Sequence, residues 1–144
     1  MSGELPQAIP GLEQTSWQPT ELHCTMNGEV QPLAACMQHL LTVIEAHDDA
    51  WPFWTSVSVA DAPDYYDIIK DPLDLSVIKE RLQRRPPFYV SLDMLRADVC
   101  RMCENCRLYN GDGDGNPYWA CAVRLEQFAR ARFAEVTVLR KPKG

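Results

Sequence analysis

The sequence predicts an all-α domain, an antiparallel bundle of four helices with a long loop between the first helix and the second. Four segments place apolar residues at helical spacing, and proline-containing segments separate them. No segment shows a convincing strand pattern, and there is no internal repeat. With 144 residues, of which 46% are hydrophobic and 24% charged, the chain is long enough for one domain with a real core.

The first helix is expected over about residues 32–47. Pro32 suits the first turn of a helix, and the helix must end before Trp51-Pro52, because a proline ring pushes the preceding residue out of the helical region. The residues that share its apolar face are Leu33, Met37, Leu40, Leu41 and Ile44.

Each of the other three helices begins at a residue that commonly caps a helix N-terminus. Asp74 precedes the second helix and Ser91 the third, while Asn116 precedes the fourth, with Pro117 at its first position. The expected apolar faces are Leu75, Ile78 and Leu82 in the second helix, Leu92, Leu95, Val99, Met102, Cys106 and Tyr109 in the third, and Ala122, Leu125, Phe128, Ala129 and Val136 in the fourth.

Two segments are expected to lack regular structure. Residues 1–30 carry Pro6, Pro10 and Pro19 without sustained periodicity, and we expect them to form an irregular N-terminal arm. Residues 50–73 combine three further prolines with many aspartates and a dense aromatic content. A connection of this length without regular structure is uncommon and usually functional, so we expect this loop to form one wall of a site.

Charge and composition narrow the class of protein. A net charge of −6 argues against direct binding of nucleic acid and favours a basic partner. No apolar run reaches the length of a membrane span, and the polar N-terminus lacks the features of a signal peptide, so we expect a soluble intracellular protein. In that setting the six cysteines are expected to remain reduced and partly buried.

The strongest candidate for a site is the segment 105–110, Asn-Cys-Arg-Leu-Tyr-Asn, which is followed at once by Gly111. A helix that ends in Tyr109-Asn110 before a glycine delivers one phenol and one carboxamide to the end of a bundle. The two N–H donors and one acceptor of Asn110 suit it to pair with another amide. Such a site can bind a ligand but has no obvious catalytic group. The simpler alternative is that Asn110 only caps the C-terminus of a helix.

Two patterns imitate metal sites. Cys100, Cys103 and Cys106 lie in a continuous helix, where their sulfurs spiral round the axis, so we expect core or boundary thiols. Residues 110–115 resemble the start of an EF-hand loop, but Cys121 stands at the twelfth position, which requires an acid. The three histidines have no nearby nucleophile or paired carboxylates. We therefore expect no metal, no cofactor and no enzymatic activity.

Three ordered motifs are similar to those of the bromodomain family. They are Trp51-Pro52-Phe53, residues 62–75 (APDYYDIIKDPLDL) and residues 105–110 (NCRLYN). The similarity covers about residues 31–138 and leaves residues 139–144 as a C-terminal tail. The chain looks most like the bromodomains of histone acetyltransferases and nucleosome-remodelling subunits. The resemblance implies a left-handed four-helix bundle whose two long loops, after the first and third helices, form a pocket for acetylated lysine.

The resemblance also implies a role for each matching residue. Asn110 would donate to the acetyl carbonyl, Tyr65 would hold that carbonyl through a water, and Tyr118 would stand at the entrance. An apolar shelf would consist of Trp51, Pro52 and Phe53, and the walls would consist of Val57, Ala62, Cys106 and Tyr109.

Some positions around this pocket depart from the family pattern or carry charge. Ser56 stands where the family usually has proline, Leu73 replaces a common methionine, and Pro86-Pro87 lengthens the second inter-helix loop. An acidic rim that would favour a peptide rich in lysine and arginine is expected from Asp61, Asp64, Asp67 and Asp71, with Asp112 and Asp114 across the gap.

The residues and the resemblance together predict a non-enzymatic module that binds acetyl-lysine in histone tails or other acetylated nuclear proteins. We expect a monomeric domain in the nucleus, within a larger chromatin complex, without direct contact with nucleic acid or membrane. Two alternatives stay open. Part of an acetyltransferase would need a phosphate cradle that the sequence does not show, and a helical protein-assembly domain would leave Asn110 and the aromatic shelf unexplained.

Overall fold

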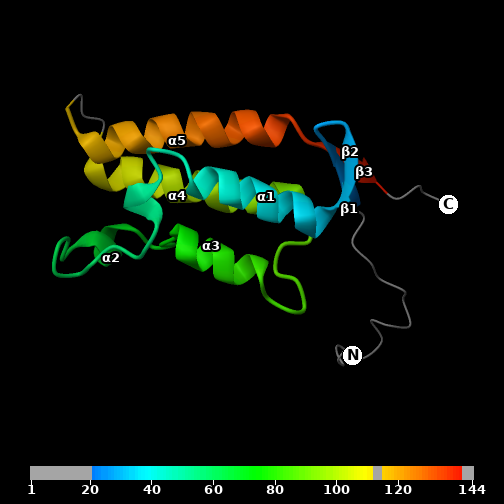
Figure 1. The fold of residues 1–144 in the computed structure, drawn as a ribbon. Helices are drawn as coiled ribbons and strands as arrows, with labels where there is room; N and C mark the ends of the chain where they lie inside the picture. Colours follow the sequence, from blue (N-terminus) through cyan, green and yellow to red (C-terminus); the bar gives the residue numbers. More distant parts are fainter. Residues whose placement is uncertain (1–20, 112–114, 141–144) are drawn as a thin grey trace.

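A computed structural model describes residues 21–111 and 115–140, and their main feature is a bundle of helices (Figure 1). Its long helices are α1 (Leu33–Glu45), α3 (Leu75–Leu82), α4 (Leu92–Asn110) and α5 (Pro117–Ala134). Helix α5 packs against α4 and α1, and α3 packs against α1 and α4. The all-α class predicted from the sequence is confirmed.

All three residues predicted as N-caps make capping hydrogen bonds in the structure. Asp74 accepts a hydrogen bond from the backbone N–H of Val77 at 3.1 Å, and Ser91 accepts one from Met94 at 3.2 Å. Asn116 accepts two, from the backbone N–H groups of Tyr118 and Trp119. These side chains satisfy donors that lack a partner in the first turn of each helix. Local chemistry therefore sets where α3, α4 and α5 begin.

The core lies along the faces that the helical spacing predicted. Leu41, Ile44, Leu75, Ile78 and Leu95 are among its fully buried side chains. Four residues that we expected on inner faces are only partly buried, and these are Leu82, Tyr109, Phe128 and Val136.

A small antiparallel sheet closes one end of the bundle, opposite the end at which α2 lies (Figure 1). Its strands are β1 (Glu21–Met26), β2 (Glu29–Pro32) and β3 (Thr137–Arg140), in the order β2-β1-β3. The expectation of no strand was wrong here. The irregular structure expected over residues 1–30 is wrong where β1 and β2 lie, and β3 extends into the expected tail, residues 139–144. Residues 1–20 and 141–144 fall outside the described residues.

Two features of the sequence explain this sheet. Asn27 and Gly28 have φ values of 55° and 78°, the positive pair that a tight hairpin turn of the favoured hand requires. Cys24 and Met26 alternate with exposed or half-buried neighbours and are buried against the core. The Asn-Gly pair was a local signal for this hairpin, but the pairing of β1 with β3 joins opposite ends of the chain and has no local signal.

The long loop between α1 and α3 is more ordered than expected. It contains a 3₁₀ turn, η2 (Trp51–Phe53), and a single turn of α-helix, α2 (Tyr65–Ile68). No helix in the described part of the chain is long and apolar enough to span a membrane.

The packing of α5 leads to a stability prediction. Leu125 is fully buried, whereas Leu108 on α4 is 66% exposed. Leu125→Ala should lower the free energy of unfolding by about 2 to 5 kcal/mol, because the truncation removes apolar contacts and leaves a cavity. Leu108→Ala should change it by less than about 0.5 kcal/mol. Urea denaturation of the two variants measures this difference, and equal losses would contradict the packing described.

Candidate ligand-binding pocket

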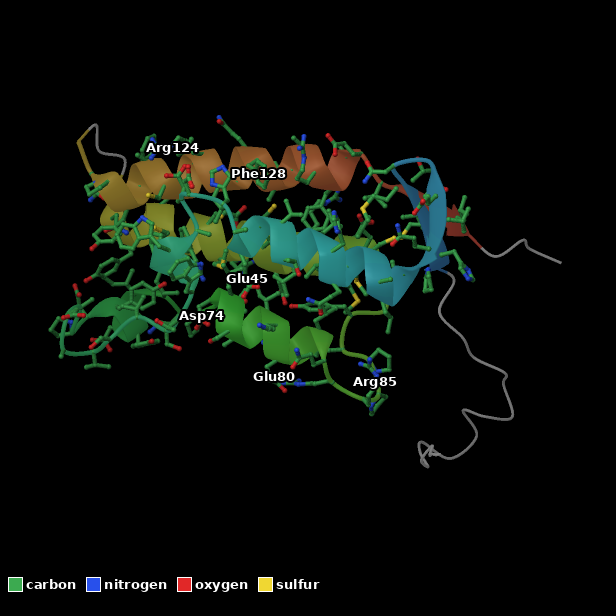
Figure 2. All side chains as sticks on the ribbon, in the orientation of Figure 1. Glu45, Asp74, Glu80, Arg85, Arg124 and Phe128 are labelled. Carbon is green, nitrogen blue, oxygen red and sulfur yellow. The ribbon has the colours of Figure 1, made fainter. Side chains whose placement is uncertain are left out.

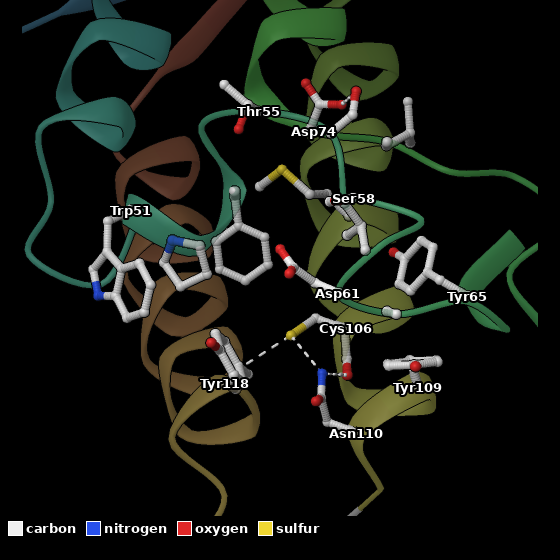
Figure 3. A pocket seen from close by; sticks show the side chains of 17 residues that line it. Trp51, Thr55, Ser58, Asp61, Tyr65, Asp74, Cys106, Tyr109, Asn110 and Tyr118 are labelled. Carbon is white, nitrogen blue, oxygen red and sulfur yellow. Dashed lines mark hydrogen bonds between the residues drawn. The ribbon is translucent and has the colours of Figure 1, made fainter.

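A cavity of about 560 Å³ opens at the end of the bundle, between the long loop, the end of α4 and the start of α5 (Figure 3). All ten residues predicted as site residues line it. They are Trp51, Pro52, Phe53, Val57, Ala62, Tyr65, Cys106, Tyr109, Asn110 and Tyr118. The fold thus brings together residues from three separate segments; their contacts with a ligand stay predictions.

The apolar shelf of the cavity is the 3₁₀ turn η2, which contains Trp51, Pro52 and Phe53. The backbone N–H of Phe53 donates to the carbonyl of Ala50 at 2.9 Å, and the Phe53 ring is buried. Trp51 is 49% exposed, and its ring faces that of Tyr118, with centroids 5.8 Å apart. The shelf therefore has one side in the core and one aromatic edge at the opening.

Asn110 is the last residue of α4, and Gly111, with a φ of 71°, ends the helix directly after it. The Nδ2 of Asn110 donates to the backbone carbonyl of Cys106 at 2.8 Å and to the Cys106 Sγ at 3.4 Å. A carboxamide nitrogen carries two hydrogens, so the bond to the carbonyl orients the amide, and the second hydrogen has only a sulfur, a weak acceptor, as its partner. Asn110 therefore ends α4 and also lines the cavity.

Tyr65 and Tyr109 form the wall opposite the shelf. Their rings meet edge to face at 4.9 Å, and Tyr65 is buried. Burial is the main cause that raises the pKa of Tyr65 to about 12, and the nearby Cys106 thiol is the second. The phenol therefore keeps its proton at neutral pH. The hydroxyl of Tyr109 donates to Asp64 Oδ1 at 2.6 Å, which raises the pKa of Tyr109 and ties the end of α4 to the loop.

Cys106 lies between the apolar shelf and the wall of Tyr65 and Tyr109, as Figure 3 shows. Its thiol donates to the backbone carbonyl of Tyr118 at 3.4 Å. Burial raises the pKa of Cys106 to about 11, although the hydrogen bond from Asn110 acts in the opposite direction. The thiol is therefore a neutral, apolar part of the wall at physiological pH.

Seven further residues line the cavity without having been predicted as site residues. They are Thr55, Ser56, Ser58, Asp61, Leu73, Asp74 and Met102. The Ser56 hydroxyl donates to Asp74 Oδ2 at 2.9 Å, and Asp74 also caps α3. The sequence revealed Asp74 as a cap and Ser56 as a departure from the family pattern, but no local signal joined two residues 18 positions apart.

Polar bonds hold the long loop over the cavity. The Tyr66 hydroxyl donates to the carbonyl of Val57 at 2.7 Å, and the Asn105 side chain donates to the carbonyl of Asp71 at 2.8 Å. Asn105 is itself buried on α4, so this bond also satisfies a buried amide. The loop is thereby held by hydrogen bonds at several points along its length.

The cysteine run is buried within α4, as expected for core thiols. Cys100, Cys103 and Cys106 are all buried, and burial raises the pKa of each. Within the described ranges, no group of three histidine, cysteine or acidic residues is arranged to hold a metal ion. Asp112 and Asp114, the core of the EF-hand-like pattern, lie outside the described residues.

The acidic residues of the expected rim lie on the surface of the long loop. Asp61, Asp64, Asp67 and Asp71 are all exposed, and Asp61 is the one among these four that lines the cavity. Asp64 and Asp71 accept hydrogen bonds from α4 residues. The loop therefore presents carboxyl groups both at the cavity, through Asp61, and on the surface beside it.

Comparison with known proteins gives a consistent family. The bromodomain family model matches residues 37–124. A protein named histone acetyltransferase GCN5 from Oryza sativa subsp. japonica is 39% identical over 132 residues, which cover 85% of this chain and 25% of that protein. A protein of the same name from Yarrowia lipolytica is 34% identical over 131 residues, which cover 91% of this chain and 27% of that protein. The chain spans about a quarter of the length of these relatives.

Comparison with solved structures leads to the same family. The crystal structure of CpBRD2 from cryptosporidium matches with a TM-score of 0.65 and 32% identity, covering 72% of this chain and 94% of that one. The bromodomain of human BAZ1A matches with a TM-score of 0.61 and 32% identity, covering 67% and 90%.

The burial of Cys106 leads to a prediction about its reactivity. Because alkylation requires the thiolate, a pKa of about 11 instead of the ordinary thiol value of 9.0 should slow labelling by iodoacetamide at pH 8. The rate at Cys106 should be about 100-fold below that of the urea-unfolded chain, since each pKa unit is a factor of ten in thiolate. Mass spectrometry of the peptide containing Cys106 measures the rate. Labelling of the folded protein as fast as the unfolded chain would contradict the burial described.

Proposed function

This chain belongs to the bromodomain family, whose domain is an acetyl-lysine reader module, and we propose that its cavity binds acetylated lysine in histone tails or other acetylated nuclear proteins. The observation that carries this proposal is the Asn110 carboxamide at one end of a cavity whose other side is the shelf of Trp51, Pro52 and Phe53. One polar anchor and one apolar surface are what a neutral acyl amide requires.

The chemistry of acetylation explains that requirement. Acetylation removes the lysine charge and adds a methyl group and an amide. The modified side chain therefore favours an apolar channel, provided that its amide finds a hydrogen-bond partner there. In the proposed complex the N–H of Asn110 that contacts the Cys106 Sγ donates to the acetyl carbonyl instead, and Tyr65 contacts that carbonyl through a water. The methyl group lies near Phe53 and Val57.

The charge around the opening supports a basic peptide as the ligand. The long loop carries exposed aspartates, and the chain as a whole has a net charge of −6. Lysines and arginines beside the acetylated residue would gain from this field, mostly in the rate of association and in specificity. Histone tails have that composition.

The bromodomain itself is a non-catalytic module, and we propose that this chain acts as a reader within a larger chromatin complex. The relatives named histone acetyltransferases are about four times longer than the matched region, so catalysis in them is a property of a longer protein. We further propose that the domain is monomeric and nuclear. If the domain served protein assembly alone, its affinity for a histone peptide would not depend on acetylation of that peptide.

Asn110→Ala should remove binding of an acetylated histone peptide while the fold stays intact. The ligand carbonyl would be buried without its direct donor, which costs about 1 to 3 kcal/mol or more. Because Asn110 lies at the end of α4 and is only partly buried, the free energy of unfolding should change little. Isothermal titration calorimetry and urea denaturation measure the two quantities.

The matched control for this experiment is Leu108→Ala, which alters an exposed side chain in the same last turn of α4 that does not line the cavity. It should bind as the unaltered protein does. Undiminished affinity in Asn110→Ala would refute the role assigned to Asn110.

Acetylation should raise the affinity for a given histone peptide by at least about tenfold, which is roughly 1.4 kcal/mol. An unmodified lysine would bring its ammonium past Trp51 and Phe53 to Asn110, losing water on the way and meeting N–H donors of like polarity. Attraction to the acidic loop acts at the exposed mouth, where salt screens it. Fluorescence polarisation with paired peptides at several salt concentrations measures the difference. Equal binding of the two peptides at moderate salt would rule out acetyl-lysine recognition.

A further inference from the structure

An ion pair joins the start of the long loop to α5. Arg124 Nε donates to Asp49 Oδ2 and Arg124 Nη2 donates to Asp49 Oδ1, both at 2.9 Å. The two residues are 75 positions apart in the sequence. Two parallel bonds of this kind fix the direction of the carboxylate as well as its distance. The pair is therefore a geometric link between the loop and the helix.

Asp49 is held on its other sides as well. Its backbone N–H donates to His47 Nδ1 at 3.0 Å, and the ring of His47 packs against that of Phe128 on α5 at 4.4 Å. Figure 2 shows Arg124 and Phe128 along α5. The bond from Arg124, with a smaller contribution from Cys121, lowers the pKa of Asp49, so the carboxylate is charged at neutral pH. The segment that directly follows α1 is thereby docked on α5 at two points.

The shelf of the cavity follows this docking point directly. Ala50 is fully buried, and its carbonyl accepts the backbone N–H of Phe53 at 2.9 Å, which closes the turn η2. After the turn, the Trp54 Nε1 donates back to the carbonyl of Glu45 on α1 at 3.1 Å. A short turn tied at both ends has little freedom to move apart from its anchors.

Helix α5 also carries the aromatic ring that faces the shelf. Tyr118 precedes Arg124 by six residues, which is about 9 Å along a helix axis at 1.5 Å per residue. Its ring lies 5.8 Å from that of Trp51, centroid to centroid. One rigid helix thus holds both the anchor of the shelf and the residue across the opening from it.

We propose that Asp49 and Arg124 are positioning residues that set the spacing between Trp51 and Tyr118, and so the affinity of the cavity for its ligand. This inference rests on the proposed acetyl-lysine function. Neither residue lines the cavity, so neither is placed to contact an acetyl-lysine side chain inside it. Without the pair, the shelf must be ordered when the ligand binds, and that ordering reduces affinity.

The effect on stability separates this role from a purely structural one. The Arg124 side chain is 57% exposed and that of Asp49 15%, and an ion pair with one partner in solvent contributes little to folding stability. Arg124→Gln and Asp49→Asn should therefore leave the thermal midpoint nearly unchanged. Each should weaken binding of an acetylated histone peptide by about three- to tenfold, the effect of ordering one or two side chains on binding.

A double-mutant cycle tests the proposal with the folded chain. The double variant Asp49→Asn with Arg124→Gln should bind no more weakly than either single variant, because both substitutions remove the same link. Arg84→Gln is the matched control, since Arg84 makes an equally bidentate pair with Glu80, at 2.8 Å for both bonds, at the end of α3 and away from the cavity. It should bind as the unaltered protein does.

The second readout is structural and needs no ligand. Nuclear Overhauser contacts between the rings of Trp51 and Tyr118 should be present in the unaltered protein and in Arg84→Gln. They should weaken in Arg124→Gln and in Asp49→Asn. Unchanged affinity in both single variants, or reduced affinity with unchanged Trp51–Tyr118 contacts, would overturn the inference alone. Failure of the unaltered protein to bind any acetylated peptide would defeat the proposed function and this inference with it.

Discussion

Helices α4 and α5 bury a continuous apolar surface against each other, which includes Met102, Cys103, Ala122 and Leu125. Because α4 ends at Asn110 and α5 begins just after Asn116, this packing also decides where the polar groups of the cavity lie. Interiors packed at crystal-like density resist small displacements, so the carboxamide is held in place by the core beneath it. The remaining elements are arranged around this pair of helices.

The long loop is held on that pair by polar contacts together with apolar burial. The bonds from Tyr109 to Asp64, from Asn105 to Asp71 and from Arg124 to Asp49 each start on α4 or α5 and end on the loop or at its beginning. The buried apolar residues of the loop are Ala50, Phe53, Ala62, Tyr65, Ile69 and Leu73. The directional bonds add to this packing, because each fixes the distance and the angle between one donor and one acceptor.

The polar groups of the site fall into three sets. Burial raises the pKa of Tyr65 and of Cys106, so that both groups stay uncharged at physiological pH. Two carboxyl groups, those of Asp61 and Asp74, also line the cavity, and Asp74 is buried and accepts a hydrogen bond from Ser56. Asp64, Asp67 and Asp71 lie on the exposed surface of the loop, where salt screens their interaction with a ligand.

The sequence by itself determined those features that depend on residues close together in the chain. Helical spacing and the caps Asp74, Ser91 and Asn116 located the helices, and the family resemblance that three motifs carry identified ten of the 17 residues that line the cavity. Tertiary structure decided the contacts between distant residues: the pairing of β1 with β3, the bond from Ser56 to Asp74, and the pair of Asp49 with Arg124. The reason is physical. Caps and periodicity act within a turn or two of helix, whereas a contact across 75 positions exists only after the core has brought both partners together.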